Sequence, residues 1–219
     1  MSSYPITFVE DVFESPDAVR EFALEQKYES FDKVKNYPGK RTDPISEICP
    51  ELDGQIISTI ISQFYDIRMS PVEIDADSYF HIIPASYSDT GYLHRDSKIL
   101  LSAVTYLNKD STNSGTSIYS SKKINTFQLD QDTINQGYQT KNDPEWQNYV
   151  NSKTENFVEI ARVNNVYNSM IIFNGYRAHK AHLKSPTATE DRLTIVTFVR
   201  SILAAENPKE RSRLVNCFT

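Results

Sequence analysis

Two side chains near the middle of the sequence, His94 and Asp96, have the types and the spacing of metal ligands. They form a His-x-Asp pattern just after Gly91 and Tyr92, where we expect a strand to begin or end. On an extended segment, residues i and i+2 project to the same side, so both side chains can reach one metal ion. A single His-x-Asp arises by chance in many chains, and the pattern therefore needs a third ligand from elsewhere.

A histidine far along the chain can supply that ligand. His179 follows an apolar run, residues 170–173, and a turn at residues 174–176, whereas His182 is the alternative slightly further on. Two imidazoles and one carboxylate are the donor set of non-haem iron(II) sites, and thiolates would favour zinc or iron–sulfur clusters. Three protein ligands leave three positions open, of which a 2-oxo acid can occupy two and dioxygen the third.

Arg192 and Thr194 begin the last strongly apolar segment and share one face of an extended strand. An arginine that points into a barrel without an acidic partner costs several kcal/mol, roughly, and so requires an anion. A ligand carboxylate is a natural partner for a guanidinium group. Asp191, although adjacent, is expected to point to the opposite face.

Composition excludes several other classes of protein. The six glycines are never closer than fifteen residues, which rules out a dinucleotide-binding fingerprint, a P-loop and a Gly-x-Ser-x-Gly nucleophile elbow. The two cysteines, Cys49 and Cys217, cannot form a Cys-x-x-Cys motif. The net charge of −6 disfavours nucleic acid as a partner. The chain has neither a signal-peptide pattern nor a long apolar run, so we expect no membrane association and a cytoplasmic location.

The first third of the chain has a helical pattern. Ser15, Pro16 and Asp17 form a helix start signal, and a second helix is expected at about Glu51–Tyr65, with a loop at residues 37–42 between the two. From about Val72 the pattern changes to short strands without intervening helices, which indicates an antiparallel sandwich or barrel. The candidate strands are Tyr79–Pro84, Ile99–Leu107, Thr116–Ser120, Phe157–Val163, Ser169–Phe173 and Leu193–Ser201.

We expect one domain over residues 1–219, with helical support at 1–70, a β region at 72–202 and a tail at 203–219. A polar insertion at about 130–156, which contains Tyr138, Trp146 and Tyr149, is either a partly helical lid or a surface excursion.

With these residues in order, the sequence resembles the iron(II)- and 2-oxoglutarate-dependent dioxygenases, in their prolyl-hydroxylase-like branch. The resemblance covers roughly Tyr79–Ser201 and depends on His94, Asp96, His179, Arg192 and Thr194. Residues 106–110 and 90–92 resemble the corresponding stretches of oxygen-sensing prolyl hydroxylases. The gap from His179 to Arg192 is longer than usual, and Ser114 replaces the first glycine of a Gly-Gly pair. The resemblance implies an α+β, mainly β fold, in which N-terminal helices brace a double-stranded β-helix of the jelly-roll or cupin type.

The resemblance also implies an activity. An enzyme of this kind hydroxylates an aliphatic C–H bond with iron(II), 2-oxoglutarate and dioxygen, releases succinate and carbon dioxide, and can use ascorbate as a reductant. His94, Asp96 and His179 would be the catalytic metal ligands, with His179 favoured over His182 because the family places its ligand six residues beyond the position of Phe173. Arg192, Thr194 and Tyr106 would bind the 2-oxoglutarate carboxylate.

The substrate would be a prolyl residue of a peptide or protein, or a small molecule; the sequence does not indicate the oligomeric state. Two alternatives stay open: a cupin-like metal enzyme that does not use 2-oxoglutarate, and a non-catalytic barrel that binds a ligand. Release of succinate separates the first alternative from the oxygenase.

Overall fold

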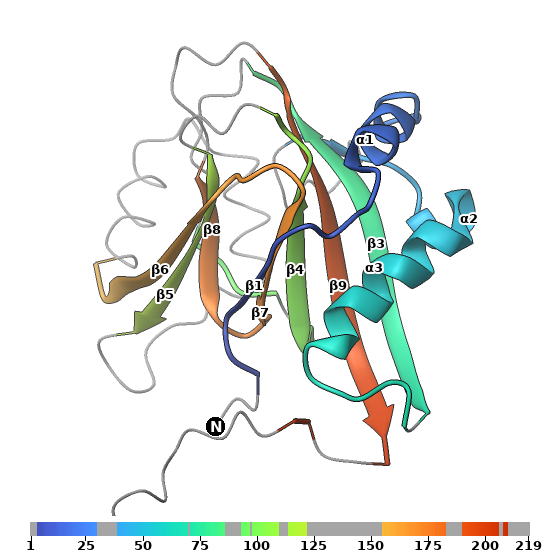
Figure 1. Ribbon diagram of the computed structural model, residues 1–219. Coiled ribbons are helices and arrows are strands. Elements are labelled where there is room, and N and C mark those ends of the chain that lie inside the picture. Colours follow the sequence, from blue (N-terminus) through green and yellow to red (C-terminus); the bar gives the residue numbers. More distant parts are fainter. Residues whose placement is uncertain are drawn as a thin grey trace, which may run out of the picture.

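The computed structural model describes residues 4–29, 39–69, 71–85, 93–96, 98–109, 114–121, 155–182, 190–205 and 208–209. Within these residues the chain is mainly β, with antiparallel sheets and few helices (Figure 1). The helices are α1 (Pro16–Leu24), α2 (Ile45–Ile48) and α3 (Pro50–Ser62). None of them has both the length and the apolar character that a membrane-spanning helix needs.

The strands form two sheets. The larger sheet has the order β1-β7-β4-β9-β3-β2 and the smaller one the order β6-β5-β8. The strands are β1 (Thr7–Val9), β2 (Lys40–Arg41), β3 (Val72–Ile83), β4 (Leu101–Tyr106), β5 (Gly115–Ser121), β6 (Phe157–Asn164), β7 (Ser169–Asn174), β8 (Ala178–His182) and β9 (Arg192–Ala204).

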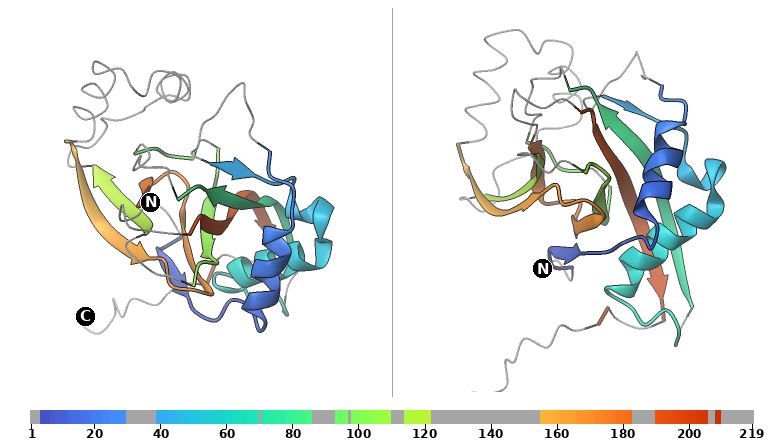
Figure 2. Two further views of the ribbon diagram at one scale, coloured as in Figure 1. Left: turned by 90° about the horizontal axis from the view of Figure 1, so that it is seen from above. Right: turned by 45° about the horizontal axis from the view of Figure 1, so that its top comes forward.

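The helices cover one face of the larger sheet, and the smaller sheet lies on its other side (Figure 2). In α3 the apolar side chains of Ile56, Ile60 and Ile61 recur at helical spacing and are completely buried. They join a core that contains Phe80 of β3, whose ring lies 6.0 Å from the ring of Phe22 in α1. The helices are therefore held against the sheet by ordinary hydrophobic packing.

The opposite face of the larger sheet carries a second, smaller core cluster. It consists of Tyr106, Ile118, Ile171 and Phe173, which come from β4, β5 and β7. Side chains alternate between the two faces of a strand. Ser102 lies four positions before Tyr106 in β4, so its side chain is on the same face. This face, between the two sheets, is where the candidate site lies.

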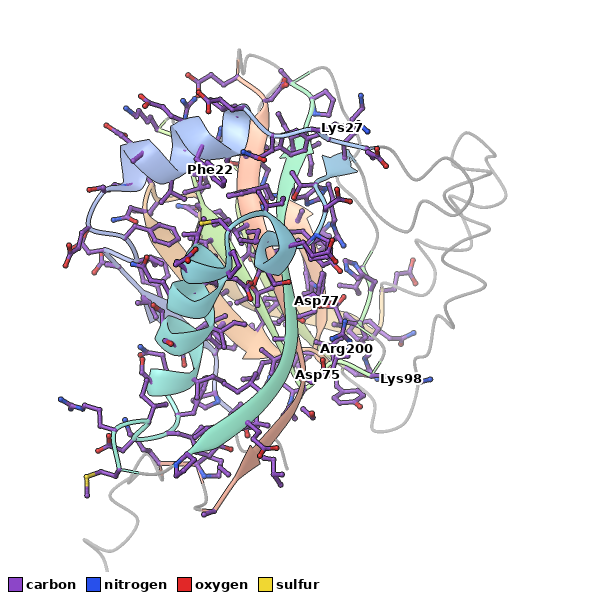
Figure 3. All side chains as sticks on the ribbon, turned by 90° about the vertical axis from the view of Figure 1, so that its right-hand side faces the viewer. Phe22, Lys27, Asp75, Asp77, Lys98 and Arg200 are labelled. Carbon is purple, nitrogen blue, oxygen red and sulfur yellow. The ribbon has the colours of Figure 1, made fainter. Side chains whose placement is uncertain are left out.

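β3 begins at Val72, whereas the sequence pattern predicted a strand only from Tyr79. The first half of β3 was not predicted because it contains acidic residues, which are uncommon in strands. Asp75 and Asp77 form ion pairs with Arg200 of β9, and the contact between Arg200 Nη1 and Asp75 Oδ1 is 2.6 Å (Figure 3). A bulge between Asp75 and Ala76 accompanies this pairing. Such exposed pairs contribute about 0–1 kcal/mol each, and the positive charge of Arg200 offsets part of the negative charge of the two aspartates.

Several expectations need correction. Lys40 and Arg41 form β2 instead of lying in a loop, and the first 70 residues supply β1 and β2 in addition to helices. β8 was not expected from the sequence, and β9 extends to Ala204, two residues into the expected tail. The insertion up to residue 154 and the tail from residue 210 lie outside the described residues.

Candidate metal centre

His94 and His179 are neighbours through their backbones. The His94 amide donates to the His179 carbonyl at 3.0 Å, and the His179 amide donates to the His94 carbonyl at 2.8 Å. This isolated antiparallel bridge fixes both residues at one level, and the centroids of their rings are 4.3 Å apart. Two segments distant in sequence therefore converge at one point through the smallest unit of sheet pairing.

Asp96 completes the cluster. Its amide donates to the Gly175 carbonyl at 2.9 Å, which attaches the His-x-Asp segment to the turn before β8. Asp96 Oδ1 lies 3.8 Å from His94 Nε2, and Asp96 Oδ2 lies 3.5 Å from His179 Nε2. The three ligand atoms all lie within 4.8 Å of one another, which is a separation that one metal ion can bridge.

The surroundings of His179 keep its ring neutral and its Nε2 able to bind a metal ion. The residue is 7% exposed, and its ring packs against the Phe173 ring with centroids 4.7 Å apart. Burial lowers the pKa of His179 to about 4, so the imidazole is neutral at pH 7. Nδ1 lies 2.9 Å from the Arg177 carbonyl, which can only accept, so Nδ1 carries the proton and Nε2 keeps its lone pair for a metal.

Ser102 orients the carboxylate. Its hydroxyl donates to Asp96 Oδ2 at 2.5 Å from the middle of the larger sheet. The bond holds one carboxylate oxygen in place, as outer partners of metal ligands commonly do. The sequence analysis did not identify Ser102, although strand alternation places it on the same face as Tyr106.

Arg192 is 6% exposed and has no ion pair with any described residue. Its Nε has no hydrogen-bond partner, and its guanidinium carbon lies 5.9 Å from the centroid of the Tyr106 ring. Burial lowers the pKa of Arg192, but a guanidinium group remains charged in a protein. The result is a buried cation without an acidic partner among the described residues.

Tyr106 and Thr194 flank this cation. They are register partners in β4 and β9, and both are completely buried. The Tyr106 hydroxyl lies 2.8 Å from Thr116 Oγ1, and burial raises the pKa of Tyr106 to about 12, so it stays protonated. Arg192, Thr194 and Tyr106 therefore lie close together at the end of the β4–β9 ladder.

The cluster of His94, Asp96 and His179 lies on the same side of the larger sheet as the side chain of Arg192. Ser102, which bonds Asp96, and Tyr106, which faces Arg192, are four residues apart on β4, or about 13 Å along the strand. This distance can be bridged by a small dicarboxylic acid together with the side chains of Asp96 at one end and Arg192 at the other. The backbone of His182 in β8 pairs with Gly115 of β5, and the side chain of His182 lies outside the described part.

Aromatic side chains lie beside the cluster on the same face. Phe198 of β9 pairs with Ser102, and its ring centroid is 6.5 Å from that of Tyr79 in β3. The Arg41 guanidinium lies 5.1 Å from the Phe198 centroid and 5.9 Å from the Tyr79 centroid. The wall next to His94, Asp96 and His179 is thus both aromatic and cationic, which the sequence analysis did not foresee.

Comparison with known proteins gives a family match. A protein-family model described as a family of unknown function (DUF6445) matches residues 1–199. No curated protein matches the sequence significantly.

Solved structures share the fold at low sequence identity. HygX from Streptomyces hygroscopicus, with nickel and 2-oxoglutarate bound, is 12% identical with a TM-score of 0.54, over 90% of this chain and 83% of HygX. EvdO2 from Micromonospora carbonacea var. aurantiaca is 12% identical with a TM-score of 0.54, over 95% and 91%. A prolyl hydroxylase from Trichoplax adhaerens, in complex with a peptide of hypoxia inducible factor, is 11% identical with a TM-score of 0.51, over 89% and 82%.

Proposed function

The chain belongs to the DUF6445 family, whose function is unknown, and we propose that it is an iron(II)- and 2-oxoglutarate-dependent oxygenase that hydroxylates an aliphatic C–H bond. One observation carries the proposal. A cluster of two histidines and one carboxylate lies on the same face of the sheet as a buried arginine that has no acidic partner among the described residues.

His94, Asp96 and His179 are the proposed metal ligands and the catalytic centre. Their chemistry suits iron(II), because two neutral imidazoles and one carboxylate are the donor set of non-haem iron oxygenases. The pre-set tautomer of His179 and the fixed carboxylate of Asp96 support this assignment. His179 is preferred to His182 because its ring belongs to the cluster.

Arg192, Thr194 and Tyr106 are the proposed binding residues for the 2-oxoglutarate carboxylate that lies away from the metal. Arg192 supplies the charge. The Tyr106 hydroxyl donates to Thr116 Oγ1 and the Thr194 hydroxyl donates to the His81 carbonyl, and each would turn its proton to a carboxylate oxygen when the co-substrate binds. Such a bound anion would compensate the cost of the buried guanidinium. A cupin-like enzyme without an oxo-acid co-substrate would have no anion for Arg192.

We assign the two facing sheets to a double-stranded β-helix braced by α1 and α3. The likeness in fold to HygX, which binds nickel and 2-oxoglutarate, supports this assignment and the choice of co-substrate.

Bound iron(II) would supply the activation of dioxygen that couples conversion of 2-oxoglutarate into succinate and carbon dioxide to hydroxylation of the substrate. The residues of the chain do the rest. Phe173 excludes water from one side of His179, Ser102 holds the Asp96 carboxylate, and Arg192 fixes one end of the co-substrate. These side chains set the geometry of the site before the substrate arrives.

The substrate is proposed to be either a prolyl residue in a peptide or a small molecule. Neighbours in fold include both kinds: HygX has been seen with hygromycin B, and the Trichoplax enzyme with a peptide. Tyr79, Phe198 and Arg41 form the wall that this substrate would meet.

Succinate release is the test of the proposed function. The protein is incubated with iron(II), 2-oxoglutarate, ascorbate and panels of peptides and small molecules, in air and without oxygen. We expect oxygen-dependent succinate that rises with a particular substrate and disappears in the Asp96→Ala variant. Metal binding without any binding of 2-oxoglutarate would favour the cupin-like alternative instead.

A further inference from the structure

Asn108 forms two hydrogen bonds to the backbone on either side of Arg192. Its Nδ2 donates to the Asp191 carbonyl at 2.7 Å, and its Oδ1 accepts from the Leu193 amide at 2.8 Å. Asn108 is 5% exposed, so water does not compete for either bond. The side chain thus ties the segment after β4 to the start of β9.

The position of these bonds matters because the β4–β9 ladder ends next to them. Tyr106 and Thr194 are the last register partners of the two strands, and Arg192 lies beyond that pair. The carboxamide of Asn108 therefore acts as a substitute peptide group that continues the pairing past the end of the ladder. Together with the bond from the Leu107 amide to the Leu193 carbonyl, at 3.1 Å, it fixes the backbone from which the Arg192 side chain projects.

On its other side the backbone of Arg192 pairs with Ile83 of β3, but few polar contacts among the described residues direct the guanidinium itself. Arg192 has no ion pair with the described residues, its Nε has no hydrogen-bond partner, and its guanidinium lies over the Tyr106 ring. A buried side chain with few polar contacts has an orientation set mainly by its backbone and by the walls around it. Residues 106–108 thus contribute twice. The Tyr106 ring lies under the Arg192 guanidinium, and the Asn108 carboxamide holds the backbone on either side of Arg192.

We propose that Asn108 is a positioning residue, which holds the backbone around Arg192 so that the guanidinium is aimed at the carboxylate of 2-oxoglutarate. This inference rests on the proposed function. Asn108 itself touches neither the co-substrate nor the metal cluster; it acts through Arg192.

A second asparagine provides a matched control. Asn168 makes the same pair of bonds, at 2.9 Å each, to the amide and carbonyl of Phe13, and it is 7% exposed. Because Asn168 has a φ of 60°, glycine is the replacement that removes the carboxamide without backbone strain. Asn108→Ala and Asn168→Gly therefore each delete one buried carboxamide bridge, the first beside Arg192 and the second to Phe13. The amide of Asn168 also donates to the Tyr106 carbonyl at 3.0 Å, and glycine keeps that backbone bond.

The experiment measures binding of 2-oxoglutarate to the Mn(II)-loaded protein by calorimetry, with Mn(II) binding and thermal unfolding measured alongside. We expect Asn108→Ala to weaken 2-oxoglutarate binding at least about tenfold, since loss of one well-placed charge-assisted hydrogen bond is enough for about that change, and to leave the affinity for Mn(II) within about twofold. Asn168→Gly should lower the melting temperature but keep 2-oxoglutarate binding within about twofold. Equal weakening in both variants, or none in Asn108→Ala, would show that the bridge is only structural.

Amide exchange in the unaltered protein keeps the inference testable if Asn108→Ala does not fold. When Mn(II) is present, addition of 2-oxoglutarate should slow exchange of the Leu193 amide, because loading of Arg192 stabilises the backbone that Asn108 holds. Unchanged exchange at Leu193 in protein saturated with 2-oxoglutarate would refute the positioning role. Failure of the unaltered protein to bind 2-oxoglutarate at all would instead refute the proposed function, so the two failures are distinguishable.

Discussion

The Arg192 guanidinium faces the Tyr106 ring at 5.9 Å and has no acidic partner among the described residues. A buried charge without compensation lowers the stability of the folded chain. Sites built to bind a ligand often retain such unfavourable features, because the ligand compensates them. The buried arginine therefore lowers the free energy of unfolding of the ligand-free protein, and bound 2-oxoglutarate would restore it.

Replacement of Arg192 should separate stability from binding. We expect Arg192→Met to raise the free energy of unfolding of the ligand-free protein by about 1 kcal/mol or more, as removal of buried charge often does. The same variant should weaken 2-oxoglutarate binding by a hundredfold to several thousandfold, which corresponds to about 3–5 kcal/mol for losing one member of a buried ion pair. Denaturant unfolding and calorimetry measure the two effects.

Arg200→Met is the control on the same strand, because Arg200 is exposed and paired with Asp75 and Asp77. It should change neither 2-oxoglutarate binding nor, by more than about 1 kcal/mol, stability. Unchanged 2-oxoglutarate affinity in Arg192→Met would show that the arginine has another purpose.

The three proposed ligands should be individually required for metal binding. His94→Ala, Asp96→Ala and His179→Ala should each lower Mn(II) affinity by more than the roughly 10–100-fold that the loss of an outer partner costs. His182→Ala should bind Mn(II) normally. The opposite pattern, with binding lost in His182→Ala and kept in His179→Ala, would move the distal ligand to His182.

Ser102→Ala should weaken metal binding without abolishing it. The variant frees Asp96 Oδ2 from its 2.5 Å hydrogen bond, and we expect Mn(II) affinity to fall by about 10–100-fold. Ser78→Ala is the matched control, because Ser78 is a buried serine whose Oγ accepts from Thr197 Oγ1 at 3.1 Å on another strand pair. A similar loss of affinity in both variants would mean that Ser102 acts only through stability.

The buried His179 should make the metal-free protein less stable in acid. Burial holds its pKa at about 4, below the ordinary value of 6.5, so between these values the unfolded chain binds a proton that the folded chain does not. Stability therefore falls as the pH is lowered from 6.5 to about 4, by on the order of 3 kcal/mol, and this contribution levels off below that. His179→Gln should remove this part of the slope in unfolding curves.

Nitrogen NMR of the imidazole provides the check at the level of the residue. His179 should be a neutral, Nδ1-protonated ring throughout pH 5–8 in the metal-free protein. A midpoint near 6.5 would contradict the burial of this ring.

The sequence predicted the elements whose patterns are strong and local. The isoleucines of α3 and the apolar strands β4, β7 and β9 have clear periodicities, and the structure has elements at all of these places. It did not predict β8, whose sequence, Ala178–His182, is short and mostly polar. β8 is a strand because β5 pairs with it, and such a partner far along the chain leaves no local pattern.

The same distinction applies to the site. His94, Asp96, His179 and Arg192 could be selected by residue type and spacing, because few side chains have their chemistry. Ser102 and Asn108 could not, because serine and asparagine are common polar residues. Their roles depend on partners brought close by folding: Asp96 for Ser102, and the backbone around Arg192, more than 80 residues away, for Asn108.

The most direct test of the oxygenase assignment is an anaerobic titration of the protein with iron(II) and 2-oxoglutarate, followed by visible absorption. A 2-oxo acid chelated to iron(II) gives a weak charge-transfer band. We predict that this band appears, saturates at one co-substrate per chain, and is lost in His179→Ala. An absent band at concentrations where iron(II) is bound would contradict the account.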